Sequence, residues 1–345
     1  MTADRRRARF VLVAAATCLL AVLVTSCRSD RQIRELIDQN PVKQLSFYGF
    51  DPSTPMVDRI TRAPDELLDL YGEFEDERPT VYTPSAEERD EIVAALEALP
   101  VRHQEVLQDR LIGIYCVDDF AGTGMADWVL GPDDEIYANL VLHRRVFDTT
   151  AADLIDYRAS SAFTDTSSSI DLVVELSDWV SLLQYITLHE TTHIVDYVDR
   201  YTPFVEPSTY ALQGVSRRDT TFTDQVWRGY SELRRRYAFE YQPKLRFYGL
   251  GAPEISDTLM DDVYTELAAV PVASLYGAMN WAEDFAEFVT FYYLVHTLGA
   301  DYSISVVRNG EALAEFRSME RDEVIRRAEL IDPALVTAPV AVAIH

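Results

Sequence analysis

The stretch Leu188-His189-Glu190-Thr191-Thr192-His193-Ile194 decides the fold. It lies in a longer run, from Asp178 to about Asp199, whose apolar residues recur at helical spacing around much of the circumference, which predicts one long buried helix. His189 and His193 are four residues apart and therefore project from one helix face, where both imidazoles can bind a single metal ion. Glu190 beside them is placed to act as general base for a water on that metal. The competing interpretation is a pair of histidines satisfied within a core.

A catalytic zinc site needs a third protein ligand, and the segment 280–288 offers the best one. Glu283 and Glu287 are four residues apart on one face of an otherwise apolar helical pattern, and carboxylates on a buried face need a partner. We assign Glu283 as the third ligand of one Zn²⁺ ion per chain. Glu287 is expected to accept a hydrogen bond from a ligating histidine and so fix its tautomer. A solvated or salt-bridged acidic pair is the alternative.

A second candidate for the third ligand is Asp199, six residues after His193. This is the ligand position of the HExxHxxGxxH/D pattern, which requires a glycine three residues after the second histidine. Here that position is Asp196, and aspartate adopts the left-handed conformation with difficulty. Asp196 is instead assigned, with Glu287, as an acidic group surrounding the metal ligands.

The segment from Tyr276 to Glu287, taken with His189 to Asp196, resembles the metal-site region of the gluzincin metallopeptidases related to anthrax toxin lethal factor. In that family a Tyr-Gly step precedes a Glu-x-Phe-Ala-Glu helix. The resemblance implies His189, His193 and Glu283 as zinc ligands, Glu190 as base, and Tyr276 as a donor to the developing oxyanion. It covers about 20 residues. The 90 residues between the second histidine and the third ligand exceed the family's usual spacing, which implies an insertion over residues 200–275.

The expected fold class is α+β, with a zincin-like domain in which a small antiparallel sheet packs on the metal-site helix. Strands are expected over 111–117, 126–130, 136–143 and 171–176, the second and third forming an antiparallel hairpin through the turn Gly131-Pro132-Asp133-Asp134. Helices are expected over 85–98, from residue 100 onward, and over 222–238, 258–268, 280–297 and 310–329. The strand 136–143 is a candidate sheet edge for an extended peptide. His143 within it is expected to be a surface residue.

The first 26 residues have the pattern of a lipoprotein signal peptide: a basic start, an apolar run, and small residues before Cys27. Cys27 is the expected lipidation site, which would hold the protein on a membrane without a spanning helix. An uncleaved anchor helix is the alternative, although the apolar run is shorter than the ~20 residues that a bilayer needs. Both interpretations place the domain outside the cytoplasm of a bacterial cell. Arg28 after the cysteine favours an outer membrane where the cell has two.

The remaining chain divides into a tether and N-terminal cover over residues 27–84 and a metallopeptidase domain over 85–335. The formal net charge of −26 disfavours nucleic acid as a partner. Cys116 is the one cysteine left after Cys18 and Cys27 are accounted for, and its apolar surroundings predict a buried core residue.

The expected activity is hydrolysis of a polypeptide substrate, with Glu190 taking a proton from the metal-activated water and passing it to the leaving amine. A zinc-binding envelope lipoprotein without turnover is the alternative from a different class. Hydrolysis of a non-peptide amide would use the same residues.

Overall fold

The computed structural model describes residues 30–73, 77–166, 169–214, 221–248 and 251–340. The signal segment and Cys27 lie outside the described residues. The order of elements mixes helices with several small sheets, which confirms the α+β class. Within the described part of the chain, no helix combines the length and apolar character needed to cross a membrane.

The main sheet contains five strands, with β1, β3, β5 and β4 side by side and β2 paired to β3. Their bounds are β1 Ile60–Thr61, β2 Thr80–Val81, β3 Leu111–Asp118, β4 Gly124–Leu130 and β5 Ile136–His143. β4 and β5 form the expected antiparallel hairpin, while β3 pairs parallel with both β1 and β5. The sheet that packs on α8 is therefore mixed, and the expectation of an antiparallel sheet is wrong.

The expectation that the strand 136–143 forms a sheet edge is wrong, because β5 lies between β3 and β4 and β4 is the edge. The composition of β5 explains its position within the sheet. β5 carries apolar residues on both faces and is almost entirely buried, Asn139 and His143 included, as a strand between two neighbours and covered on both sides must be. His143 at its end is buried as well, so the expectation of a surface residue is also wrong.

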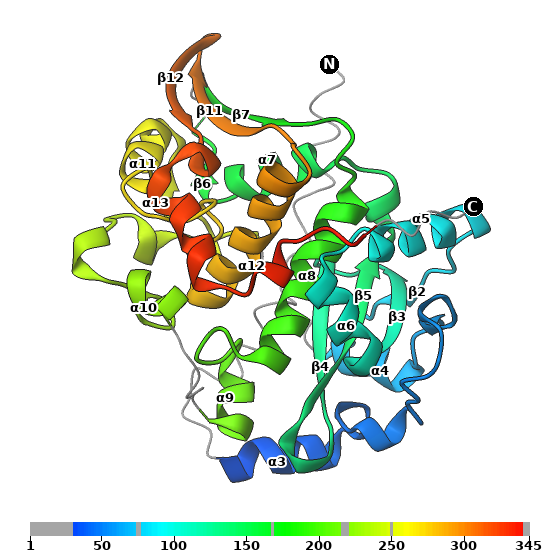
Figure 1. The fold of residues 1–345 in the computed structure, drawn as a ribbon. Coiled ribbons are helices and arrows are strands. Elements are labelled where there is room, and N and C mark those ends of the chain that lie inside the picture. The colour runs from blue at the N-terminus through cyan, green and yellow to red at the C-terminus, as the bar shows by residue number, and fades with distance from the viewer. Residues whose placement is uncertain (1–29, 74–76, 167–168, 215–220, 249–250, 341–345) are drawn as a thin grey trace.

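The helix α8, Leu182–Asp199, lies against β4 and β5 and forms the centre of the molecule (Figure 1). The Ser181 hydroxyl caps its start by accepting from the N–H of Gln184, and Arg200 ends it in the left-handed conformation with φ +62°. All of its residues except Gln184 and Val198 are buried. On its other side packs α12, Trp281–Tyr292, which continues into a π-helical turn, Tyr293–Thr297.

A second sheet of three antiparallel strands lies beyond α12, in the order β12, β11, β7. The bounds are β7 Ile170–Leu176, β11 Tyr302–Arg308 and β12 Glu311–Phe316. The helix expected over 310–329 is therefore wrong in its first part. Asn309 and Gly310 both have positive φ, +53° and +85°, and form the two-residue turn that closes a hairpin.

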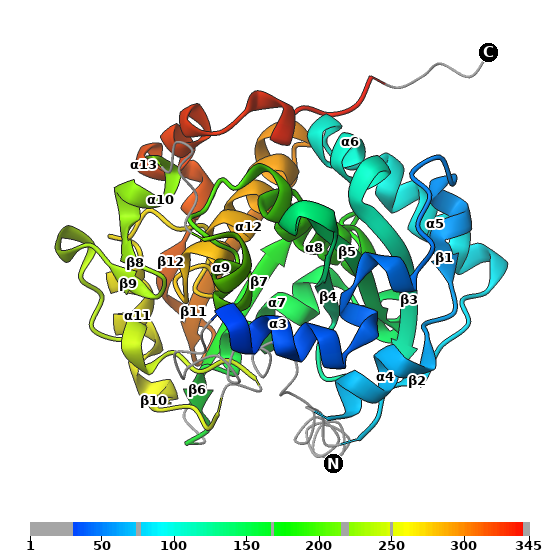
Figure 2. The ribbon, with the colours of Figure 1, turned by 90° about the horizontal axis from the view of Figure 1, so that it is seen from below.

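The remaining helices surround α8, α12 and the two sheets (Figures 1 and 2). They are α3 Asp30–Gln39, α4 Asp65–Gly72, α5 Ala86–Glu97, α6 Val101–Arg110, α7 Ala151–Ser160, α9 Pro207–Gln213, α10 Thr221–Val226, α11 Met260–Leu267 and α13 Asp322–Ile325. The helices expected near 85–98, 100, 258–268 and 280–297 are confirmed. The one expected over 222–238 is wrong after Val226, where the hairpin β8 Trp227–Gly229 and β9 Glu232–Leu233 follows.

Candidate metal centre

The helices α8 and α12 bring three potential metal ligands together, His189, His193 and Glu283. The Nε2 atom of His189 lies 3.3 Å from Glu283 Oε2, and that of His193 lies 3.6 Å from the same oxygen. Donors arranged tetrahedrally at ~2.0–2.2 Å from zinc are separated by roughly 3.3–3.6 Å. The two distances to Glu283 fall in this range, and the ligand atoms of all three side chains lie within 4.8 Å of one another, so one metal ion could contact all three.

Local sequence explains how each ligand reaches this point. The spacing of four residues stacks the two histidines on the face of α8 that meets α12. Asn280 caps α12, its side-chain oxygen accepting from the N–H groups of Ala282 and Glu283. This cap fixes Glu283 in the first turn of α12, opposite the histidine pair.

The electrostatics of the cluster favour a cation. Burial alone would lower the pKa of His189, but the carboxylates of Glu283 and Glu287 outweigh it and raise that pKa to about 10. Burial would raise the pKa of Glu283, yet the two histidines hold it well below its usual range. Without a metal the site thus retains a proton, and a divalent cation would replace that proton.

Glu287 lies directly behind His189, with its Oε1 atom 3.0 Å from Nδ1. The carboxylate is fully buried and receives hydrogen bonds from the Tyr185 hydroxyl at 2.6 Å, from Arg158 at 2.9 Å and from the Ser274 hydroxyl at 2.6 Å. Burial would raise the pKa of Glu287, but Arg158 and His189 lower it to about 2. A charged Glu287 can hold the His189 ring with Nε2 turned to the metal position.

Glu190 faces the sheet edge. Its Oε2 atom accepts from the N–H of Ala126 in β4 at 2.9 Å. Burial raises the pKa of Glu190, which brings a carboxylate closer to the range of an effective general base near neutral pH. Gly124 permits this approach, because a Cβ there would lie 2.9 Å from Glu190 Cγ and would collide with Ile186. Sequence reasoning missed this glycine, whose role depends on a helix remote in the chain.

Tyr276 lines the same cavity as Glu190, and its ring centroid lies 6.2 Å from that of His189. The Arg158 guanidinium stacks on the ring at 4.0 Å, and Phe247 packs edge-on against it at 5.0 Å. Arg158 thus contacts both Glu287 and Tyr276. It was not foreseen from the sequence, where 129 positions separate it from Glu287.

Neither aspartate after His193 belongs to the cluster of three ligands, although the charge of His193 acts on the buried Asp196. Asp196 accepts from both the N–H and the hydroxyl of Thr202, at 2.8 and 2.6 Å, and so closes the turn after α8. Its carboxylate therefore serves that turn, and within the described chain no hydrogen bond reaches Nδ1 of His193. Asp199 forms a bidentate pair with Arg102 of α6, at 2.7 Å for both bonds. The helix runs straight through Asp196, and this directs Asp199 away from the histidines.

Two further residues singled out in the sequence lie outside the centre. His143 accepts from the N–H of Arg145 through Nδ1 at 2.9 Å and lies 3.6 Å from Asp118. Cys116 is a buried free thiol in β3, as expected, and burial raises its pKa to about 12. Neither residue takes part in the cluster of ligands.

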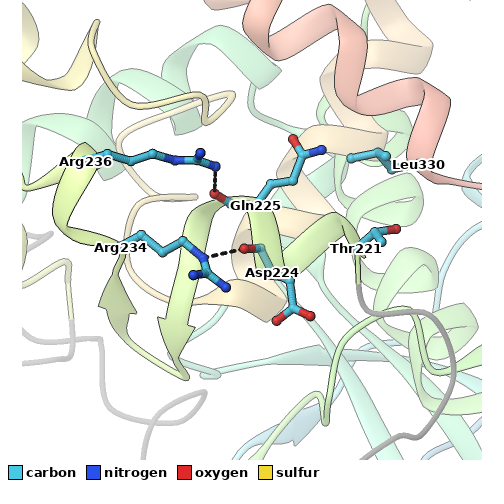
Figure 3. A pocket seen from close by; sticks show the side chains of 6 residues that line it. All are labelled: Thr221, Asp224, Gln225, Arg234, Arg236 and Leu330. Carbon is cyan, nitrogen blue, oxygen red and sulfur yellow. Dashed lines mark hydrogen bonds between the residues drawn. The ribbon is translucent and has the colours of Figure 1, made fainter.

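The metal centre opens into a cavity of about 120 Å³ between β4 and the segment that follows α8. Besides the ligands and Glu190, it is lined by Trp128, Tyr197, Glu206, Tyr230, Tyr276 and Met279. A larger cavity of about 510 Å³ lies beside α10 (Figure 3). Its two arginines, Arg234 and Arg236, donate to main-chain carbonyls of α10, so their charge supports local structure.

No family model, curated protein or solved structure matches this chain. The case for a function therefore rests on the geometry of the site.

Proposed function

We propose that this chain is a zinc-dependent peptidase of zincin-like architecture that hydrolyses polypeptide substrates outside the cytoplasm. The observation that carries the proposal is the convergence of His189, His193 and Glu283, whose ligand atoms lie within 4.8 Å of one another, with Glu190 beside them in the sequence and lining the same cavity. A purely structural zinc site has four protein ligands and no use for a buried carboxylate next to an open position.

The roles follow from the positions of the side chains. Zinc, when bound to the two histidines and Glu283, would polarise the scissile carbonyl and lower the pKa of a water. Glu190 accepts the proton of that water and delivers it to the leaving amine. The edge strand β4 offers main-chain groups to an extended peptide, and Ala126 in that edge already contacts Glu190. Tyr276 is the proposed donor to the oxyanion.

The test combines metal analysis with turnover. We expect purified protein to bind one zinc per chain and to cleave members of a proteome-derived peptide library. Glu190→Gln should keep its zinc and lose at least 10²-fold in kcat/KM, since general base catalysis contributes roughly 10²–10⁴-fold. Glu283→Gln should lose zinc, whereas the matched control Asp199→Asn should retain it.

Two results would replace this proposal with another. Stoichiometric zinc without cleavage of any peptide would favour an envelope lipoprotein that uses the zinc fold for binding alone. Hydrolysis restricted to non-peptide amides would make the protein a zinc amidase. Protein that binds no zinc under metal-replete conditions would contradict the site itself.

A further inference from the structure

The outer edge of β4 is the natural place for a peptide strand, and its accessible groups can be assigned. Ala126 directs its N–H to Glu190 and therefore away from β5. Because hydrogen-bonding direction alternates along an antiparallel strand, Trp128 and Leu130 also turn their main-chain groups outward. A substrate strand that begins at the metal centre would extend along these three residues.

The N-terminal segment already occupies the far part of this edge. Lys43 donates to the carbonyl oxygen of Trp128 at 3.2 Å, and Gln44 forms a parallel bridge with Leu130. Just beyond β4, Arg34 of α3 makes a bidentate pair with Asp134 at 3.0 and 2.9 Å. Only the part of the edge from Ala126 to Trp128 is left beside the metal centre. That distance is roughly 7 Å, or two residues of an extended chain.

The contacts by which the N-terminal segment covers the far part of the β4 edge are buried. Lys43 is 4% exposed and forms an ion pair with Asp127, which is 2% exposed. The same ammonium lies 4.7 Å from the centre of the Trp128 indole ring. Removing one partner of a buried pair is strongly destabilising, so the segment is held in place. In Figure 2, α3 lies across the gap between α9 and the β4–β5 hairpin, and it contacts α9.

Two acidic side chains, Asp127 and Glu206, and one ammonium group, Lys43, lie at the closed end. Glu206 lines the cavity and accepts from the Tyr197 hydroxyl at 3.1 Å. Burial raises the pKa of Glu206, while the charge of Lys43 lowers it. A second ammonium group, such as the amino terminus of a peptide, would balance the charge of this end.

The direction of β4 also favours binding of a peptide's amino terminus at the closed end. Antiparallel pairing is the more stable and the more common arrangement of neighbouring strands. β4 runs from Gly124 by the metal centre toward Leu130 at the closed end. A peptide paired antiparallel to it places its amino end at Trp128 and Glu206 and its carboxyl end toward Gly124.

We infer that the segment 40–48, through Lys43 and Gln44, restricts this protein to polypeptides with a free amino terminus, from which it removes one or two residues. The inference rests on the proposed peptidase function. Glu206 is the residue that would recognise the terminal ammonium group, and Lys43 the residue that sets the length.

A peptide series tests the inference directly. Fluorogenic peptides would carry one, two, four or six residues before the scissile bond, each with a free or an acetylated amino terminus. We expect kcat/KM for the free one- and two-residue members to exceed that of all others by at least 100-fold. Lengthening the carboxyl side should change it less than threefold. Equal cleavage of the longer or acetylated peptides, or a length limit on the carboxyl side, would overturn the inference.

Two variants connect the preference to the named residues. Lys43→Met with Asp127→Asn removes both buried charges together, so no unpaired charge remains, and should admit the four-residue peptides. Glu206→Gln should reduce the preference for a free over an acetylated terminus by at least tenfold. An unchanged preference in both variants would overturn the assignment.

A peptide-binding experiment tests this inference separately from the proposed peptidase function. The same peptides would be titrated by fluorescence anisotropy into zinc-loaded Glu190→Gln protein, which requires no turnover. Tighter binding of the short peptides with free termini supports the inference even if no peptide is cleaved by the parent. Equal affinity for peptides with free and with acetylated amino termini contradicts the inference, even if the parent cleaves peptides.

Discussion

Single side chains decide how well the centre holds a metal, and Glu287 is the clearest case. Its Oε1 atom lies 3.0 Å from His189 Nδ1, and its carboxylate accepts hydrogen bonds from Arg158, Tyr185 and Ser274. Side chains that contact a metal-binding histidine and orient its ring typically contribute roughly 10–100-fold to metal affinity. We expect Glu287→Gln to weaken zinc binding by that factor in a competition titration with a chelator.

A matched control lies three residues earlier in the same helix. Asp284, next to Glu283 in the sequence, is equally buried, and its carboxylate pairs with Arg327 at 2.6 and 2.8 Å and accepts from the Trp227 indole N–H. Asp284→Asn should lower the free energy of unfolding while leaving the zinc affinity unchanged. If both variants weaken zinc binding equally, Glu287 acts through stability alone.

The buried His103 predicts how stability depends on pH. Its Nε2 atom lies 2.9 Å from the Thr192 hydroxyl, and burial lowers its pKa to about 3, against ~6.5 in an unfolded chain. Between these values the unfolded state binds a proton that the native state does not. The stability contributed by the neutral ring is therefore complete above pH 6.5 and is lost as the pH falls toward 3.

We expect this loss to appear as a difference between the parent and His103→Gln. From pH 7 to pH 5, the parent should lose about 2 kcal/mol more of its free energy of unfolding than the variant. Urea unfolding at both pH values, with chelator present to keep zinc out, measures the difference. Parallel losses in the two proteins would contradict a neutral buried His103.

At the scale of elements, the contact between β4 and α8 sets the distance from the sheet edge to the base. Gly124→Ala would force the strand away from Ile186 and Glu190. Overpacking of this kind costs about 1–3 kcal/mol. We expect that loss in thermal or urea unfolding, together with lower peptidase activity, because Ala126 moves with the strand. Gly229→Ala, where the nearest atom would be 3.6 Å away, is the control and should change neither quantity appreciably.

At the scale of the whole molecule, the cleft is assembled from parts far apart in the sequence: β4, α8, the turn at Glu206, α12 and the segment at Lys43. α3 begins at Asp30, three residues after the proposed lipid site. The segment that closes one end of the cleft is thus the first part of the chain after the proposed anchor.

The anchor itself predicts where the protein is found. In the native host, Cys27→Ser should abolish incorporation of labelled palmitate and move the protein from the membrane fraction to the soluble extracytoplasmic fraction. The zinc content of the purified variant should not change. Membrane association that survives the substitution, without label, would instead indicate an uncleaved anchor helix.

The sequence by itself was sufficient for the local features. The spacing of His189 and His193, the apolar residues at helical spacing around them and the turn between β4 and β5 are short-range properties, and the structure contains each one. The same reasoning failed at residues 310–316, where apolar and charged residues in a short run suit a helix as well as a strand. There Asn309 and Gly310, both with positive φ, form the turn of a hairpin, and the residues after them pair as a strand.

Tertiary structure alone decided which remote side chains meet. Glu283 joins the histidines because α12 packs on α8, and Asp199 is excluded because Arg102 of α6 pairs with it. Nothing in the sequence marks Arg158 as the partner of Glu287, or Lys43 as the residue that closes the edge of β4. A helix or turn reflects neighbours a few positions away, whereas a buried charge is stable only with a partner that packing brings to it.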